Sequence, residues 1–458
     1  MKLCKISYHV VSITIGCVIG VIIFGFDFNN MSSVEYFNLS IGILFFVAYF
    51  YQIIYVFVSL FKKPKRLTSS RNHKFAFVIC ARNESTVIEG LLKSIALQDY
   101  PAELIDVFVV ADNCTDDTGE IARKNGAIVL NRSDKKSLGK GHALKFAFDT
   151  ILKDYAHCNH EAFILVDADN LLDKNYVKEM NVTYDNGSLV STSYRNSKNY
   201  SSNWISSGYS IWFLREARYL SQARNSMNSS CVVSGTGFYV AADLLKKNGG
   251  WKWFLLTEDI EFSAWCISNG IRIGYSQHAI LYDEQPVTFA QSWTQRIRWA
   301  KGFYQVISNY GSTLLKGIFV NKYKMRLACY DLTMTIAPGM LLTFFVLIVN
   351  LSTIVAYPIE ELTLQVLGLH TLFAIFFVFI NYIIFTLTVG ILTVVTERKF
   401  IHASLGKRLL SVLTFPIFMF TYIPIAVVSL FKKVKWTPTS HSINVSLEDF
   451  SKSGDESR

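Results

Sequence analysis

Five long apolar runs frame a mostly polar middle region of this chain. They cover residues 10–26, 39–61, 328–356, 366–396 and 409–431. A helix needs about 20 mostly apolar residues to cross a bilayer, and each run meets or approaches that length. The first run lacks a clean small-x-small cleavage site and a second run follows closely, which argues against a cleaved signal peptide. We therefore expect a multi-pass protein of the cell membrane.

Between the second and third runs, the pattern changes to short strands that alternate with helices. Strands are predicted at 74–81, 105–112, 127–132 and 161–169, and helices at 86–98, 119–126 and 139–155. This alternation is typical of an α/β domain with a doubly wound, mostly parallel sheet. Ligands bind such sheets beyond the carboxyl ends of the strands. Polar clusters stand at three of these ends: Arg82–Glu84, Asp112–Asn113 and Asp167–Asp169.

These patterns divide the chain into five predicted parts. They are two N-terminal transmembrane helices (1–66), the α/β domain (67–285), amphipathic interface helices (286–327), C-terminal transmembrane helices (328–436) and a flexible tail (437–458). The fold class expected is therefore a mostly parallel sheet domain inserted between α-helical membrane segments.

The net charge of +10 fits this membrane reading. Basic residues gather beside the apolar runs, at 62–66, 316–326, 397–408 and 432–435. This is the positive-inside pattern, and it favours contact with anionic lipid over binding of nucleic acid. The N-terminus and residues 62–327 are expected to face the cytoplasm, and the eight scattered cysteines suit a reducing compartment.

The far end of the chain is ambiguous. The acidic loop at 357–362 should lie outside, but three full C-terminal spans would then place the basic residues 432–435 outside too. Pro416 and Pro424 leave open that residues 409–431 are broken or re-entrant.

Three motifs on the sheet domain carry candidate donor chemistry. Asp167 and Asp169 place two carboxylates at a strand end, which suits Mg²⁺ or Mn²⁺, although a simple turn is the alternative. Asp112 ends another strand and is placed to accept hydrogen bonds from a base or ribose, ahead of a helix that Thr115 is expected to cap. Lys140, flanked by two glycines at a helix start, is placed to reach a diphosphate.

A second group of motifs suits catalysis and acceptor binding. Glu258 and Asp259 open a helix, where they either complement its dipole or supply a general base for an acceptor hydroxyl. The preceding segment 231–241, predicted as a strand punctuated by glycines, places Ser234 and Gly235 where they shape an acceptor pocket.

The stretch "QSWTQRIRWAKG" (291–302) should form a helix that carries Gln295, Arg298 and Trp299 on neighbouring positions. Tryptophan suits a membrane interface and also the apolar face of a sugar, and arginine suits a diphosphate. Chemistry alone favours a helix that rests on the membrane surface.

Five segments taken in order resemble the family 2 glycosyltransferases. They are "CARNES", "ADNCTDDT", "DAD", "TED" and "QRIRW", the last matching the family's Q-x-x-R-W signature. The similarity covers about residues 74–305 and is greatest to the membrane-embedded processive synthases of cellulose, hyaluronan, chitin and poly-N-acetylglucosamine. It implies a GT-A fold, a UDP-sugar donor and Mg²⁺ or Mn²⁺.

The resemblance also assigns roles to residues. Donor binding falls to Ala81, Glu84, Asp112, Lys140, Asp167 and Arg298. Metal binding falls to Asp169 with Asp167. Catalysis falls to Asp259, as the base, and Glu258. Acceptor binding falls to Gln295, Trp299, Ser234 and Gly235.

The expected function is an inverting, processive transfer of a UDP-activated sugar into a β-linked polysaccharide. UDP-N-acetylglucosamine is favoured as donor and UDP-glucose comes next. Two alternatives stay open: transfer of one sugar to a membrane lipid, and a transporter or sensor that binds a nucleotide sugar without turnover. Because three C-terminal runs are few for a complete channel, an accessory membrane subunit or a dimer is a further expected partner.

Overall fold

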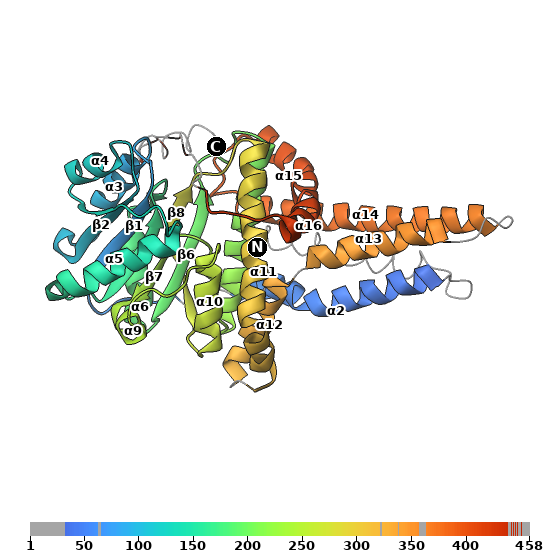
Figure 1. The fold of residues 1–458 in the computed structure, drawn as a ribbon, viewed down its shortest axis with the longest axis horizontal. Coiled ribbons are helices and arrows are strands. Elements are labelled where there is room, and N and C mark those ends of the chain that lie inside the picture. Colours follow the sequence, from blue (N-terminus) through green and yellow to red (C-terminus); the bar gives the residue numbers. More distant parts are fainter. Residues whose placement is uncertain are drawn as a thin grey trace.

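The computed structural model describes residues 33–62, 66–320, 323–337, 339–356 and 363–437, and single residues at 441, 443, 445, 447 and 450. The predicted apolar run 10–26 and the acidic loop 357–362 lie outside the described residues. In the described part of the chain, a sheet domain lies on one side of the long helix α11 (Phe289–Val320), and a group of apolar helices lies on the other side (Figure 1).

One eight-stranded sheet organises the polar domain, in the order β3-β2-β1-β4-β7-β6-β8-β5. Its strands are β1 (Phe75–Ala81), β2 (Ile105–Asp112), β3 (Ile128–Arg132), β4 (Ala162–Asp167), β5 (Leu171–Leu172), β6 (Val190–Ser197), β7 (Phe238–Ala241) and β8 (Ile273–Asp283). Among the strands of the described residues, only β7 and β5 pair antiparallel with their neighbours. The predicted mostly parallel sheet is confirmed.

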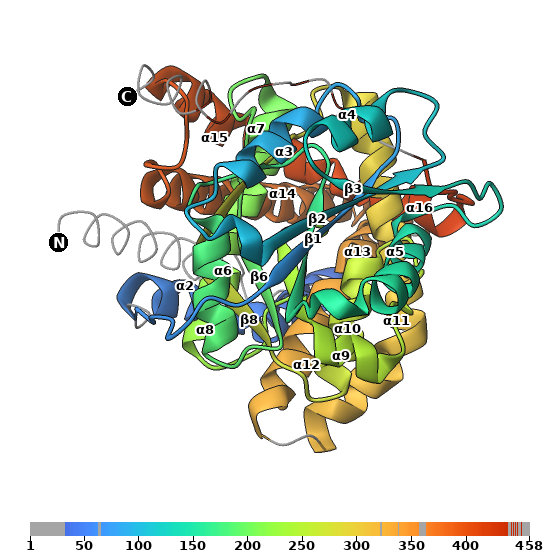
Figure 2. The same cartoon turned by 90° about the vertical axis from the view of Figure 1, so that its left-hand side faces the viewer.

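Helices cover both faces of this sheet (Figure 2). They are α3 (Ile88–Ala96), α4 (Thr118–Lys124), α5 (Lys140–Asp154), α6 (Tyr176–Asp185), α7 (Trp204–Arg215), α8 (Gln222–Ser226), α9 (Ala242–Asn248) and α10 (Glu258–Ser268). Short 3-10 turns lie at Ala102–Leu104 and Ala156–Cys158, and a π-helical segment, Glu216–Ser221, joins α7 to α8.

The strand β1 shows why its sequence is apolar at nearly every position. Successive side chains of a strand point to opposite faces, so Val78 joins one buried core while Phe77 and Ile79 join the other. A strand covered on both faces reads as a continuous apolar run. The strand ends at Ala81, and the polar residue Arg82 follows it directly.

Strand register brings the predicted polar ends together. In the ladders, Cys80 of β1 lies opposite Asp167 of β4, and Ala81 lies opposite Ala111 of β2. The carboxyl ends of β1, β2 and β4 therefore form one edge, and β6 and β8 run the same way.

The apolar helices are α2 (Ser33–Phe61), α13 (Gly339–Ala356), α14 (Thr363–Thr396), α15 (Leu405–Phe420) and α16 (Tyr422–Phe431). The more polar helix α12 (Tyr323–Ile336) directly precedes α13. The helices α2, α13 and α14 project together from the sheet domain (Figure 1). Among the described residues, three stretches are long and apolar enough to cross a membrane: Tyr36–Phe61, Phe379–Thr396 and Leu405–Phe431.

One of the predicted spans differs from the structure, and an open question about another is answered. The run 328–356 is not one helix, because α12 ends at Ile336 and α13 begins at Gly339. The helix α12 packs against α11 (Phe289–Val320), so its apolar residues belong to a protein core. The helix between Leu405 and Phe431 is interrupted at Thr421, which agrees with a broken segment.

Candidate active site

The first polar cluster of the edge is held by an internal ion pair. Asp112, at the end of β2, accepts a 2.5 Å hydrogen bond from Nη1 of Arg132, and both side chains are buried. Asn113, in a left-handed conformation, donates to the same carboxylate at 2.8 Å. Asp112 therefore has its charge already compensated within the domain.

The helix α5 is placed by two close approaches. It begins at Lys140, after Gly139 at φ 124°, a conformation that favours glycine. A Cβ atom on Gly141 would lie 2.3 Å from the carbonyl oxygen of Trp253. The start of α5 therefore packs directly on the chain that leads into α10, and a larger residue at Gly141 does not fit.

Lys140 links the two halves of the site. Its Nζ forms an ion pair with Asp167 and donates at 2.8 Å to the carbonyl oxygen of Gly235. Burial lowers the pKa of Lys140, but the carboxylates of Asp167 and Glu258 outweigh this effect and raise it. The lysine is therefore fully charged at the point where the sheet edge meets the loop that contains Gly235.

Glu258 and Asp259 form the first turn of α10 beside this loop. The backbone N–H of Gly235 donates to Oδ2 of Asp259 at 2.6 Å. Burial, together with the charge of Asp259, raises the pKa of Glu258 to about 7, and burial also raises the pKa of Asp259. A carboxyl group with a raised pKa is a stronger base than an exposed one, which suits proton abstraction near neutral pH.

Asp169 lies in a second group of carboxylates at the same edge. Its Oδ2 accepts a 3.0 Å bond from the backbone N–H of Glu284, and it is almost fully buried. Burial raises the pKa of nearby Asp283, and Asp169 adds to that rise. Together with Asp167, this is an all-oxygen donor set, which fits Mg²⁺ or Mn²⁺ by its chemistry.

A different group of metal-ligand types lies at the opposite edge of the sheet. Asp106, Cys158 and His160 place one potential ligand atom each within 4.8 Å of the others. Asp106 already accepts from His160 at 2.7 Å and pairs with Lys74 at 3.1 Å. Because the cation of Lys74 compensates this carboxylate, we interpret the group as a structural network.

The described residues near the C-terminus lie against the sheet edge. Nδ1 of His441 lies 3.1 Å from the carboxylate of Glu84, and the guanidinium of Arg82 lies 5.5 Å from the ring centre of Trp436. Burial lowers the pKa of His441, but Asp169 and Glu84 outweigh it and raise that pKa to about 10. The histidine is therefore a cation beside Glu84.

The helix α11 covers the other side of the site. Gly302 packs so closely on Thr257 that a Cβ atom there would lie 2.5 Å from its side chain. Trp299 contacts the rings of Tyr209 and Phe213 edge-on, with centroids 5.8 and 6.3 Å away. The helix is thus fixed against the residues that precede Glu258.

Comparison with known proteins identifies the domain. Residues 73–302, half of the chain, match the family described as "Glycosyltransferase like family 2". The chain belongs to glycosyltransferase family 2. This glycosyltransferase is 24% identical over 294 residues to the beta-monoglucosyldiacylglycerol synthase of Nostoc sp., covering 61% of this chain and 60% of the relative.

The same domain is similar to a polymer-forming enzyme and to a solved structure. It is 26% identical over 270 residues to the poly-beta-1,6-N-acetyl-D-glucosamine synthase of Staphylococcus aureus, covering 57% of this chain and 61% of that protein. The chain thus spans about 60% of the length of both curated relatives. The mannosyltransferase PcManGT from Pyrobaculum calidifontis, solved with GDP-Man and Mn²⁺, matches with a TM-score of 0.55 at 17% identity, covering 87% of this chain and 99% of that one. This likeness shows the GT-A fold.

The glycosyltransferase brings most predicted site residues to one place. Lys140, Asp167, Gly235 and Asp259 are joined by direct contacts, and the charge of Arg298 acts on Glu258. Arg298 itself donates a 3.4 Å hydrogen bond to the carbonyl oxygen of Leu256, just before Glu258, and Gln295 has a buried side-chain oxygen that finds no partner among the described residues. Ala81 ends β1 at the same edge.

Several sequence expectations need correction. Residues 231–237 form a loop, and only Phe238–Ala241 is a strand. The helix α4 begins at Thr118 and not near Thr115, and Asp116 accepts from its first N–H at 3.1 Å. Thr115 instead donates its backbone N–H to Asn83 at 2.8 Å.

Four charged residues of the site were not predicted from the sequence. They are Arg132, Arg195, Asp283 and His441. A signal existed for Arg132, which ends a predicted strand one position from the edge. Arg195 and Asp283 belong to β6 and β8, which were not predicted as strands.

Proposed function

We propose that this family 2 glycosyltransferase moves a sugar from a UDP-activated donor to a carbohydrate acceptor with inversion, and repeats the reaction to build a β-linked polysaccharide. The observation that carries the proposal is the pair of bonds made by Gly235. Its N–H holds the carboxylate of Asp259 and its carbonyl oxygen holds Lys140, which pairs with Asp167. Gly235 therefore fixes the position of the proposed base, Asp259, relative to Lys140 in the proposed donor site.

The proposed reaction is a single displacement. Asp259 accepts the proton of an acceptor hydroxyl while that oxygen forms a bond to the anomeric carbon of the donor. The bond between that carbon and the diphosphate oxygen breaks, and UDP leaves with the electron pair. Lys140 and Arg298 supply positive charge toward the leaving diphosphate. With an α-linked donor, the product is β-linked.

We propose a divalent cation at Asp167 and Asp169. When bound, it would neutralise charge on the donor diphosphate. Support comes from the oxygen donor set and from the Mn²⁺ named for PcManGT, which has the same fold. The ion pair between Lys140 and Asp167 means that this lysine must turn from the carboxylate toward the phosphates when both bind.

The donor pocket is proposed to include Ala81, Glu84 and Asp112. Glu84 reaches this role only after His441 moves, because the two side chains are in contact. We propose N-acetylglucosamine first and glucose second as the sugar, supported by the names of the two curated relatives. The catalytic domain is proposed to face the cytoplasm, with an accessory membrane subunit or a second copy completing a channel.

Transfer of one sugar to a membrane lipid is the second candidate. A curated relative is named a glucosyldiacylglycerol synthase, and three helices here are able to span a membrane. The test uses membranes that contain this protein, labelled UDP-N-acetylglucosamine or UDP-glucose, and Mg²⁺ or Mn²⁺. A long labelled polymer, absent with Asp259→Asn, supports the first candidate. A short lipid-extractable product supports the second, and absence of UDP release overturns both.

A further inference from the structure

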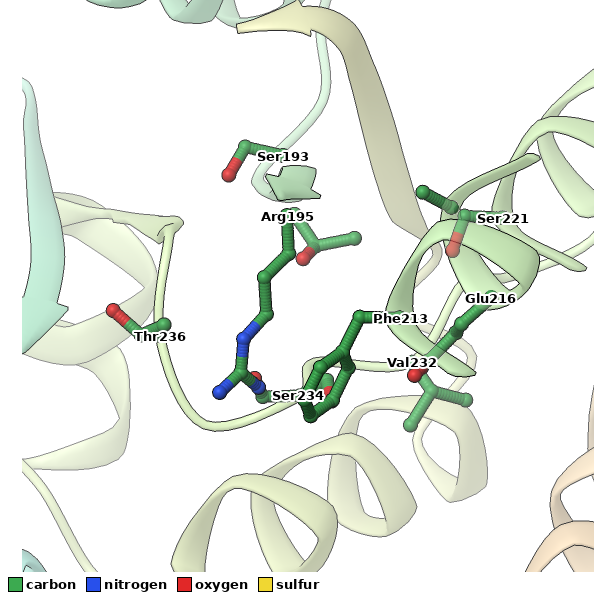
Figure 3. A pocket seen from close by; sticks show the side chains of 10 residues that line it. Ser193, Arg195, Phe213, Glu216, Ser221, Val232, Ser234 and Thr236 are labelled. Atoms are coloured by element: carbon green, nitrogen blue, oxygen red, sulfur yellow. The ribbon is translucent and has the colours of Figure 1, made fainter. Parts of the chain in front are cut away.

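A small cavity opens beside the loop that holds the proposed base (Figure 3). Its volume is about 20 Å³, enough for one water-sized group. Its walls come from β6, from α7, from the π-helical segment and from the loop that precedes β7. Four of the lining residues carry its chemistry: Arg195, Phe213, Glu216 and Ser234.

The cavity and the proposed base share one wall. The carbonyl oxygen of Ser234 accepts a 2.9 Å bond from Nη1 of Arg195, and the next residue, Gly235, donates to Asp259. A Cβ atom on Gly235 would lie 3.7 Å from Arg195 and 4.0 Å from Asp259. A group seated in the cavity is therefore separated from the base only by this loop.

Arg195 is immobilised along one side of the cavity. It pairs with Asp283 and lies over the ring of Phe213, with 3.8 Å between the guanidinium carbon and the ring centre. Figure 3 shows these two side chains lying side by side among the residues that line the cavity. Trp299 contacts the edge of Phe213, so the cavity adjoins the residue predicted to meet the acceptor.

Glu216 supplies the carboxylate of this cavity and has no fixed partner. It opens the π-helical segment Glu216–Ser221, a rare form that is frequent at functional sites. Within the described part of the chain, no hydrogen bond or ion pair is made by its carboxylate. Burial raises its pKa, while three arginines that include Arg195 and Arg224 oppose the rise. Such a group is poised to accept hydrogen bonds from something that enters the cavity.

We infer that this cavity is a specificity subsite that takes one hydroxyl or hydroxymethyl group of the terminal acceptor sugar, with Glu216 accepting its hydrogen bond. The inference rests on the proposed function. A carboxylate, the hydroxyl of Ser234 and an aromatic ring suit a sugar, whose edges are hydroxyls and whose faces are apolar. The hydroxyl of Thr236 is already bonded to Asn170 and to the N–H of Asp167. A diacylglycerol acceptor presents one hydroxyl beside acyl chains and would leave Glu216 unpaired. Glu216 is thus a specificity-determining residue, and Arg195 positions the wall beside it.

The test separates donor use from acceptor use in Glu216→Gln and Glu216→Ala, with Glu89→Gln on the exposed face of α3 as control. The main readout is the number of sugars incorporated per UDP released. We expect this ratio to fall at least about fivefold in both Glu216 variants, since water replaces a badly held acceptor, while donor KM stays within about twofold. The Gln variant preserves volume, and its thermal midpoint checks the fold.

A second readout identifies the group that is bound. Tetramers of glucose and of N-acetylglucosamine, each lacking one hydroxyl of the terminal sugar, are supplied as acceptors. The wild type should lose about tenfold in acceptor kcat/KM for one deoxy position, and Glu216→Ala should lose nothing further at that position.

The possible failures are distinguishable. Absence of UDP release by the wild type rejects the proposed function itself. Wild-type UDP release combined with an unchanged ratio in both Glu216 variants overturns the subsite alone. An equal fall in donor and acceptor kcat/KM also overturns it, because a merely structural role predicts that result. If the enzyme does not use the tetramers, the number of sugars incorporated per UDP released with endogenous acceptor decides whether the subsite proposal stands.

Discussion

The backbone N–H of Gly235 donates a 2.6 Å hydrogen bond to Oδ2 of Asp259. This bond favours the ionised carboxylate, whereas burial favours the protonated one, and the net result is a raised pKa. Gly235 itself has φ 78°, a conformation that favours glycine. The loop therefore fixes the orientation of Asp259 while leaving it basic.

Asp259→Asn should remove the proton acceptor and keep the geometry. An asparagine side chain still accepts from Gly235, so the fold and donor binding should be preserved. We expect UDP release to fall by about 10²–10⁴-fold, the usual contribution of a general base. Donor binding should change less than about twofold by titration calorimetry. Asp243→Asn, exposed on α9, is the control. Wild-type UDP release in Asp259→Asn would remove Asp259 from the base role.

The raised pKa values predict an unusual acid limb in the pH profile. The base acts only as a carboxylate, so the rate should fall as the pH drops through the pKa of the Glu258–Asp259 pair. That fall should lie near pH 7, where the pKa of Glu258 is placed, and not near pH 4. Glu258→Gln removes a like charge and should move the limb to lower pH. A kcat/KM profile over pH 5–9 measures both, and a limb that Glu258→Gln leaves unmoved would show that the pair is not coupled.

Much of the sheet edge at the carboxyl ends of β1, β2 and β4 could be predicted from the sequence, because apolar runs end abruptly there. The strands β1, β2 and β4 are covered on both faces, so the first polar residue after each marks the edge. The prediction that strands end near Asp112 and Asp167 is confirmed for that reason.

The strand β6 shows why the rest was not readable. Its sequence "VSTSYRNS" is polar, yet nearly all of it is buried. The hydroxyl of Ser193 donates to the carbonyl oxygen of Gly237 at 2.7 Å. The hydroxyl oxygens of Ser191 and Ser276 are hydrogen-bonded at 3.0 Å. Because these partners come from distant parts of the chain, the local pattern of hydrophobic and polar residues could not predict that β6 is a buried strand. Arg195 was missed for this reason.

One helix boundary in the apolar part was predicted wrongly for a different reason. Hydropathy continues through Ile336 and Gly339, whereas the backbone separates α12 from α13 there. The sequence places Pro338 directly before Gly339, and such a pair typically ends a helix, so this break was visible locally and was not predicted. By contrast, the π-helical register at Glu216 cannot be recognised from sequence periodicity.

Removal of divalent metal tests the proposed role of Asp169. Chelator should abolish UDP release, and added Mn²⁺ or Mg²⁺ should restore it. Asp169→Asn keeps the shape of the side chain but lowers the charge of the donor set, so the metal concentration for half-activity should rise at least about tenfold. Asp149→Asn, exposed on α5, should behave as wild type. Full activity in chelator would contradict a metal at this position.

The contact between Gly302 and Thr257 predicts a remote effect on catalysis. A methyl group at position 302 would meet the side chain of Thr257 at about 2.5 Å, so α11 or the chain before Glu258 must shift. A misplacement of about 1 Å costs on the order of 100-fold in rate. Gly302→Ala should therefore lower kcat by about 10- to 100-fold with little change in unfolding temperature. Gly406→Ala, where nothing lies within 4 Å, should leave kcat unchanged. Equal kcat in the two variants would show that the contact relaxes freely.

A buried ion pair should hold the helix α12 to the catalytic domain. Nε of Arg224 in α8 donates to Asp331 of α12 at 2.6 Å, and both side chains are only 2% exposed. Tyr55 of α2 donates to the same carboxylate at 2.9 Å, so one group ties three segments together.

Asp331→Ala should leave the Arg224 guanidinium buried without a counter-ion. Breaking such a pair from one side typically costs about 3–5 kcal/mol, whereas replacing both partners by apolar residues is often neutral. We expect Asp331→Ala to lower the unfolding temperature in detergent strongly and Arg224→Met with Asp331→Leu to recover most of that loss. Because Tyr55 also loses its acceptor in the double variant, recovery should remain incomplete by about 1 kcal/mol. If the double variant is less stable than Asp331→Ala, the charges contribute net stability and the pair is more than a tether.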